Sequence, residues 1–239
     1  MNYPLYMDDA YMKEFEATVE SVQKAGENKF FVVLDNTAFY PNGGGQPYDT
    51  GKMIKDGVEY PVVYVGKFSG KISHEVSKEG LGAGDKVKGV IDWDRRHKLM
   101  RSHSAAHVLS AVFHKEAGAL ITGNQLDLEK IRIDFSIENF DREKIMEYIR
   151  MANQTIGKDL PTKSYFIARE EAEKDPSMFK LAKGMPPEMK TIRVVEIVGF
   201  DRQADGGTHV KSLGEVGKIE FLEAVNKGKS NRRVYFRLV

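Results

Sequence analysis

The sequence predicts an α+β protein with a β-rich N-terminal domain, residues 1–95, and an α+β domain, residues 96–239. Two observations support this fold class. Short alternating runs of β-branched and aromatic residues give way near residue 95 to a helical pattern of apolar residues. After that point, helices and strands mix without the regular alternation of βαβ units. We therefore expect a small barrel or sandwich followed by a mixed domain.

The first domain contains four predicted strand segments. They cover residues 15–23, 28–36, 51–68 and 84–93. Gly, Asp and Asn residues separate the segments, as is typical of turns. Short strands broken by such turns favour a closed or two-layered β structure.

The second domain begins with a helix that Asp92 or Asp94 can cap and that Gly118 can end. A second, amphipathic helix has Asn139 or Asp141 as its cap. The remaining predicted elements are a strand pair in 118–136, strands at 162–169 and 190–200, a short helical stretch at 170–182, and a hairpin over 216–239 that turns at 226–230.

The composition indicates a globular protein with a sizeable core. The chain has 239 residues, 41 % of them hydrophobic and 30 % charged, and a net charge of +1. This balance excludes a strongly cationic nucleic-acid binder but permits a local basic patch. The absence of cysteine excludes disulfides and leaves nitrogen and oxygen as metal ligands. The sequence shows neither a signal peptide nor an apolar run of membrane-spanning length, so we expect a cytoplasmic protein.

His103 and His107 lie one turn apart on the predicted first helix. Side chains four residues apart share a helix face, so two imidazoles there can converge on one ion. His114 lies about 10 Å further along the axis, too far to join them. The alternative is that both histidines decorate a solvent-exposed face. Ser104 occupies the position of the catalytic Glu in an H-E-x-x-H motif, so that peptidase motif is absent.

A metal site needs further ligands, and the stretch "DGGTHV" (205–210) offers two. Asp205 and His209 are again four residues apart, and the glycines between them allow a backbone to pass close to a ligand. The alternative is a tight turn capped by the aspartate.

Three blocks of the sequence resemble the editing domain of alanyl-tRNA synthetase and its free-standing relatives, the AlaX alanyl-tRNA editing proteins. The blocks are "TAFYPNGGGQPYDTG" (37–51), "RSHSAAHVLS" (101–110) and "DGGTHVKSLGEVG" (205–217), and the C-terminal "GKSNRRVYFRLV" (228–239) is similar too. Their order and spread resemble the medium-sized AlaX class. The resemblance implies a β-rich N-terminal domain followed by an editing domain.

The resemblance also implies a zinc site built from H-x-x-x-H and C-x-x-x-H. His103, His107 and His209 match its histidines, whereas Asp205 stands where the family usually has cysteine. Three imidazoles and a carboxylate still form a Zn²⁺ ligand set. The oxygen ligand makes the site harder, which also admits other divalent metals.

The activity implied is hydrolysis of the ester that joins a wrong amino acid to the 3′ end of tRNA for alanine. The wrong amino acid is serine and, in many members, also glycine. The backbone N–H groups near Gly207 and Thr208 are candidate oxyanion donors. Ser104 and Asn124 are candidate partners for the hydroxyl of the misattached serine. No carboxylate stands out as a general base.

Further candidate substrate contacts come from a glycine-rich loop and from two arginines. By resemblance the loop borders the editing cleft; its residues are Gly43, Gly44, Gly45 and Gln46. Pro47 follows them in place of the Lys of a phosphate-binding loop, and a plain hairpin turn is the alternative. Arg95 and Arg101 flank the histidine helix, where they can contact tRNA phosphates.

Two other functions remain open from the sequence. One is a non-catalytic tRNA-binding module whose metal site has degenerated because aspartate replaces cysteine. The other is a general metallohydrolase of small esters or peptides, although the missing helix glutamate argues against a peptidase.

Overall fold

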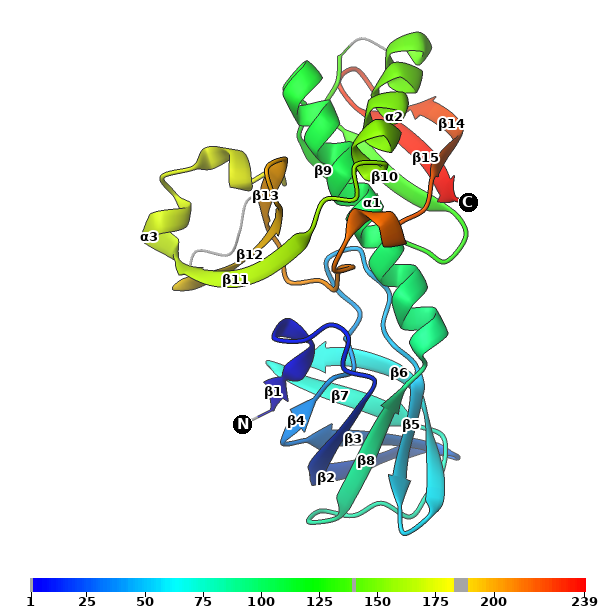
Figure 1. Cartoon of the computed structure of the whole chain (residues 1–239). Helices are drawn as coiled ribbons and strands as arrows, with labels where there is room; N and C mark the ends of the chain where they lie inside the picture. Colours follow the sequence, from blue (N-terminus) through cyan, green and yellow to red (C-terminus); the bar gives the residue numbers. More distant parts are fainter. Residues whose placement is uncertain (1, 139–140, 183–188) are drawn as a thin grey trace. The chain divides into compact units, whose positions relative to one another are not determined.

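The computed structural model describes residues 2–138, 141–182 and 189–239 (Figure 1). The chain divides into two compact units, Met1–Lys98 and Leu99–Val239. The first unit is built almost entirely of strands and the second mixes helices with strands, which confirms the predicted fold class. Helix α1 (Trp93–Ala117) starts in the first unit, and its later turns belong to the second.

Six antiparallel strands of the first unit close a barrel in the order β2-β3-β7-β6-β5-β8. They are β2 (Glu14–Gly26), β3 (Lys29–Leu34), β5 (Gly51–Lys55), β6 (Val58–Phe68), β7 (Lys71–Val76) and β8 (Lys86–Ile91). Outside the barrel, β1 (Tyr3–Pro4) pairs in parallel with β4 (Asn36–Thr37). The first unit is therefore a barrel and not a two-sheet sandwich.

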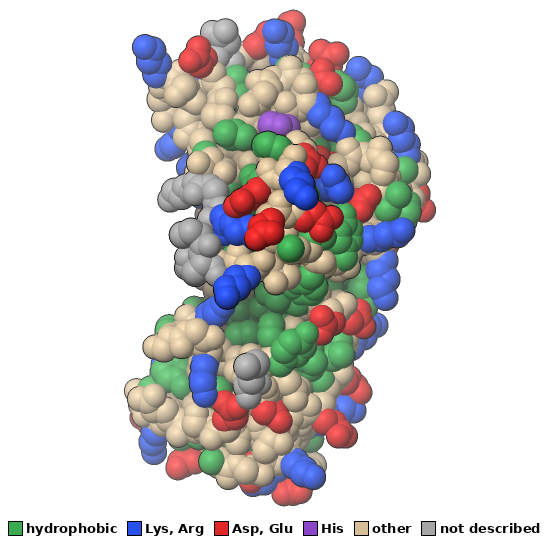
Figure 2. Space-filling model, turned by 90° about the vertical axis from the view of Figure 1, so that its left-hand side faces the viewer, with side chains coloured by type: hydrophobic (Ala, Val, Ile, Leu, Met, Phe, Trp, Pro, Cys, Tyr) green, Lys and Arg blue, Asp and Glu red, His purple; other side chains and the backbone are tan. Residues whose placement is uncertain are grey.

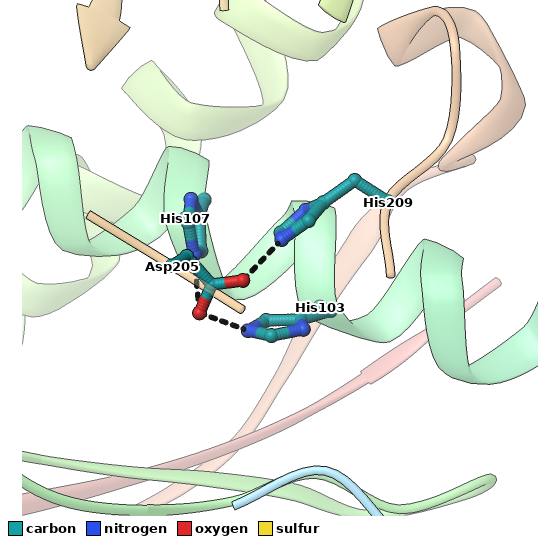
Figure 3. Close-up of side chains that lie close together, drawn as sticks. All are labelled: His103, His107, Asp205 and His209. Carbon is teal, nitrogen blue, oxygen red and sulfur yellow. Dashed lines mark hydrogen bonds and ion pairs between the residues drawn. The ribbon is translucent and has the colours of Figure 1, made fainter. Parts of the chain in front are cut away.

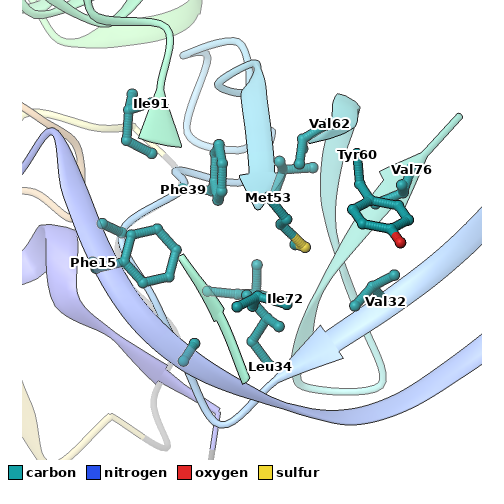
Figure 4. Close-up of a cluster of buried hydrophobic side chains, with 14 of the residues drawn as sticks. Phe15, Val32, Leu34, Phe39, Met53, Tyr60, Val62, Ile72, Val76 and Ile91 are labelled. Carbon is teal, nitrogen blue, oxygen red and sulfur yellow. The ribbon is translucent and has the colours of Figure 1, made fainter. Parts of the chain in front are cut away.

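The barrel interior is filled by the residues that point inward, at alternate positions along each strand (Figure 4). In β3, Val32 and Leu34 point inward and are fully buried. Phe15 of β2 packs edge-on against Phe39, with ring centroids 5.6 Å apart. Gly89 of β8 makes room for the Phe15 ring, because a Cβ there would lie 2.3 Å from Phe15 Cε1.

A buried ion pair fixes the first turn of α1 within the first unit. The Arg96 Nε atom donates to both carboxylate oxygens of Asp49 at 2.9 Å, and both side chains are buried. The Arg96 guanidinium also donates to the Ala10 and Ala38 carbonyls. Arg96 is thus a structural residue, although the basic run "DRRHK" (94–98), which contains it, predicts a phosphate-contacting surface from sequence alone.

His74 is a buried, neutral imidazole in the barrel wall. Its Nδ1–H donates to the Val32 carbonyl at 2.9 Å, and its Nε2 accepts from the Thr37 hydroxyl at 2.8 Å. Burial lowers the pKa of His74 from 6.5 to about 4. In the unfolded chain the imidazole regains its ordinary pKa, so acid favours unfolding between these two values.

We expect the first unit to lose stability as the pH falls from about 6.5 to about 4. At about 1.4 kcal/mol for each pH unit, the contribution of His74 amounts to about 3 kcal/mol. Urea unfolding at several pH values, followed by the fluorescence of Trp93, the single tryptophan, measures this change in the free energy of unfolding. The His74→Gln variant has no titrating group at this position, so its free energy of unfolding should depend less steeply on pH. An equally steep dependence in this variant would rule out His74 as its source.

The described residues of the second unit form two sheets. The four-stranded sheet has the order β14-β15-β10-β9, and the three-stranded sheet has the order β11-β12-β13. The strands are β9 (Ile121–Gln125), β10 (Ile131–Phe135), β11 (Thr162–Ala168), β12 (Thr191–Ile197), β13 (Asp201–Ala204), β14 (Ile219–Asn226) and β15 (Arg232–Leu238). All of them except β13 correspond to predicted strands or to the predicted hairpin.

Two helices pack near the four-stranded sheet. Phe113 of α1 stacks on Phe135 of β10 with ring centroids 4.0 Å apart, and Tyr148 of α2 (Arg142–Ile156) meets the same Phe113 ring edge-on. Asp141 caps α2 by accepting from two backbone N–H groups, as predicted, while Asn139 lies outside the described residues. The stretch predicted as helical at 170–182 contains the short α3 (Arg169–Ala172) and one 3-10 turn.

Charged side chains of both signs are interspersed on the face shown in Figure 2, in keeping with the net charge of +1. Among the residues that the structure describes, each helix is too short or too polar to cross a membrane.

Candidate metal centre

The part of α1 that carries the histidine pair is buried. His103 is 3 % exposed and His107 is 7 % exposed, so the alternative of a solvent-exposed histidine face is wrong. Residues of β13 contribute to the covering layer. Gln203 donates from its Nε2 atom to the His107 carbonyl and to the Ser110 hydroxyl, both at 3.2 Å. This strand therefore joins the polar face of α1 to the three-stranded sheet.

The chain that leaves β13 brings Asp205 and His209 to the same place. Asp205 donates its backbone N–H to the Arg193 carbonyl at 3.0 Å, which continues the pairing between β12 and β13. The buried Arg193 guanidinium then donates from Nη1 to the carbonyls of Asp205 (3.1 Å) and Gly207 (3.0 Å). Arg193 thereby fixes the backbone of the loop that presents both side chains.

Four candidate ligand side chains meet in one cluster (Figure 3). The donor atoms of His103, His107, Asp205 and His209 all lie within 4.8 Å of one another. Each histidine turns its Nε2 atom toward the carboxylate. The distances are 3.5 Å from His103 and 3.8 Å from His107 to Oδ1, and 3.1 Å from His209 to Oδ2. The structure thus brings together the four residues that the sequence analysis identified as candidate metal ligands.

The two oxygens of Asp205 have different surroundings. Oδ2 accepts the backbone N–H of Gly207 at 2.5 Å, whereas Oδ1 is the oxygen that faces His103 and His107. A carboxylate held through one oxygen can offer the other to an ion without rotating. The Gly207 N–H is used in this contact, so Gly207 supports Asp205 in the structure.

Gly207 also leaves the space that the His103 ring occupies. A Cβ atom on Gly207 would lie 2.2 Å from His103 Cε1 and 2.4 Å from His103 Nδ1, well inside van der Waals contact. Glycine at 207 is therefore a steric requirement of the cluster.

The electrostatics of the cluster favour the protonation states that bind a cation. Burial lowers the pKa of His103 to about 4 and that of His209 well below its ordinary value. Burial by itself raises the pKa of Asp205, but the interactions of the carboxylate with His103, His107 and His209 outweigh this effect, and the pKa lies well below its usual range. Neutral imidazoles and an ionised carboxylate are the forms that ligate a divalent metal. These residues therefore fit such an ion.

Two other candidate residues adjoin the cluster. The Ser104 hydroxyl lies 3.1 Å from His209 Nδ1 and 3.2 Å from the Val210 backbone nitrogen, and the side chain is buried. Thr208, which precedes His209 in the chain, is completely buried. A catalytic role for Thr208 stays a prediction.

The remaining candidates lie elsewhere in their units. Asn124 is on β9 opposite Ile133, and Arg101 donates its Nε–H to the Val216 carbonyl at 3.1 Å. In the first unit, Arg95 donates its Nε–H to the Tyr48 carbonyl at 3.0 Å. The glycine-rich loop closes through two backbone bonds between Gly43 and Gln46, at 3.1 and 2.9 Å. The substrate-binding roles expected of these residues stay predictions.

Arg193 and Gln203 are functional candidates that the sequence analysis missed. Gln203 lies in β13, which is short and poor in β-branched residues and was therefore not predicted as a strand. Arg193 interrupts the apolar run of β12, and it is buried. A charged residue inside such a run was the available signal, because buried charges require partners.

Comparison with known proteins supports the resemblance found in the sequence. Residues 192–235 match a family model described as the threonyl and alanyl tRNA synthetase second additional domain. Residues 6–95 match a model described as tRNA synthetases class II (A). Over the full length of both chains, the protein is 54 % identical to alanyl-tRNA editing protein AlaX-M of Methanosarcina barkeri. The chain belongs to the AlaX-M family.

Other AlaX-M relatives match over nearly their whole length. The AlaX-M protein of Saccharolobus solfataricus is 43 % identical, over 99 % of this chain and 98 % of the relative. Alanine–tRNA ligase of Pyrococcus abyssi is 40 % identical over 97 % of this chain, but the match covers only 25 % of the ligase. An AlaX-M chain thus corresponds to one quarter of that synthetase, and the family predicted from three sequence blocks is confirmed.

Proposed function

We propose that this AlaX-M protein hydrolyses the ester of Ser-tRNA(Ala), and also that of Gly-tRNA(Ala), at one divalent metal ion. We expect the ion to be Zn²⁺, held by His103, His107, Asp205 and His209. The observation that supports this most is the convergence of three imidazole nitrogens and one carboxylate within 4.8 Å, in a buried site. The full-length similarity to alanyl-tRNA editing proteins supports the choice of substrate.

The residues at this site have separate roles in the proposed reaction. A bound ion supplies a Lewis acid that can polarise the ester carbonyl or a water molecule. Asp205 contributes the negative charge of the ligand set, and Arg193 and Gly207 hold the loop that carries it. An aminoacyl ester is already activated, so orientation and polarisation are the main requirements. The chain therefore needs no separate carboxylate as general base in this proposal.

Deacylation of charged tRNA tests the proposal. Ser-, Gly- and Ala-tRNA(Ala) are incubated with the protein as purified, after chelation, and after zinc is returned. We expect the serine ester, and the glycine ester, to be hydrolysed while the alanine ester persists. Chelation should stop the reaction, and zinc should restore it.

Two outcomes would contradict the proposal. Tight binding of tRNA without loss of any ester would indicate the non-catalytic tRNA-binding module. Hydrolysis of small free esters, without tRNA, at the rate measured for Ser-tRNA(Ala) would indicate a general metallohydrolase.

A further inference from the structure

The Ser104 hydroxyl contacts His209, one of the candidate metal ligands, at the ring nitrogen that does not face the cluster. Ser104 follows His103 on α1, and its Oγ atom lies 3.1 Å from His209 Nδ1, on a residue 105 positions away in the chain. The Val210 backbone N–H donates to the same oxygen at 3.2 Å. Both Ser104 and His209 are buried. The hydroxyl therefore holds the imidazole from the side opposite to the cluster.

The two ring nitrogens of His209 have separate partners. Nε2 faces Asp205 Oδ2 at 3.1 Å, inside the cluster, and Nδ1 faces Ser104 Oγ. A nitrogen that ligates a metal must offer its lone pair, so a neutral imidazole bound through Nε2 carries its proton on Nδ1. Ser104 Oγ has two lone pairs and can accept from Nδ1–H and from the Val210 N–H together.

The hydroxyl suits both states of the ligand. Without an ion, Nε2–H can donate to Asp205 while Nδ1 accepts from the Ser104 hydroxyl. With an ion on Nε2, the ring proton lies on Nδ1 and the Ser104 oxygen becomes the acceptor. A side chain that could only donate or only accept would fit one of these states alone.

We propose that Ser104 is a positioning residue for the metal centre: its hydroxyl orients the His209 ring and stabilises the Nδ1–H tautomer that leaves Nε2 for the ion. The inference rests on the metal centre of the proposed function. It gives Ser104 the role of orienting the ligand His209, whereas the sequence suggested a contact with the hydroxyl of the substrate. Outer partners of this kind are worth about 10- to 100-fold in metal affinity.

Zinc affinity in three variants tests the inference by competition with a chelator. Ser104→Ala should bind zinc about 10- to 100-fold more weakly than the unchanged protein. Ser104→Thr retains a hydroxyl and should bind with nearly the original affinity. Ser102→Ala is the matched control, because Ser102 is a buried serine on the same helix whose hydroxyl donates to the Asp127 carbonyl and not to an imidazole. It too should bind nearly normally.

Nitrogen NMR of the zinc-loaded protein gives a readout of the ring itself. We expect a slowly exchanging Nδ1–H signal from His209 in the unchanged protein and in Ser104→Thr, and its loss or rapid exchange in Ser104→Ala. Unchanged affinity in Ser104→Ala, or a zinc-loaded His209 without Nδ1–H, would overturn the inference. If Ser104→Ala does not fold, the presence or absence of the His209 Nδ1–H signal in the unchanged protein still tests the inference. Failure of the unchanged protein to bind zinc would instead refute the proposed metal centre.

Discussion

Replacing His107 by alanine is expected to abolish tight zinc binding and to slow deacylation of Ser-tRNA(Ala) by about 1000-fold. That factor corresponds to about 4 kcal/mol of lost transition-state stabilisation. His107 supplies one of three imidazole nitrogens in the cluster, and alanine leaves a small cavity without a ligand atom. Metal content after purification and single-turnover deacylation rates measure both effects.

His114→Ala is the control for this variant. His114 lies on the same helix, but its Nδ1 contacts the Ala119 carbonyl and it is outside the four-residue cluster. We expect zinc content and deacylation to remain near their original values. An active, zinc-dependent His107→Ala protein would show that the cluster is not the site of the reaction.

Gly207→Ala is expected to weaken zinc binding and to lower the deacylation rate by about 100-fold while the fold is retained. The added Cβ would lie 2.2 Å from the His103 ring, so the ring or the loop must move. His103 is buried and has little freedom to swing away, and a displacement of about 1 Å at a reacting site costs about 100-fold. Thermal unfolding and zinc competition separate a local effect from loss of the fold.

Gly82→Ala offers a matched comparison in the first unit, because a Cβ there would approach no atom closer than 3.8 Å. It should bind zinc and deacylate normally. If Gly207→Ala did the same, the close approach between the loop and His103 would carry no functional weight.

Local patterns in the sequence predicted most of the fold. Asp141 caps α2, and Gly118, at φ +61°, follows the last residue of α1, because caps and left-handed glycines act over a few residues. The closure of the first unit was not decided by sequence, since a barrel and a sandwich share the same alternation of apolar residues. The missed strand β13 is held mainly by pairing with β12.

Local patterns in the sequence likewise predicted only part of the candidate site. The spacing of His103 and His107 predicts their convergence, because both lie on one helix. Their burial depends on β13 and the following loop, which come from far along the chain, so a helix pattern alone could not predict it. Arg96 shows the reverse case: it belongs to a basic run in the sequence but is buried against Asp49.

X-ray absorption at the zinc edge, combined with anomalous diffraction from zinc-loaded crystals, tests the central claim most directly. We predict one ion per chain with three imidazole nitrogens at about 2.0–2.1 Å, a carboxylate oxygen of Asp205 at about 2.0–2.2 Å, and no sulfur. An ion bound elsewhere, or one bound by fewer than two of His103, His107 and His209, would contradict it.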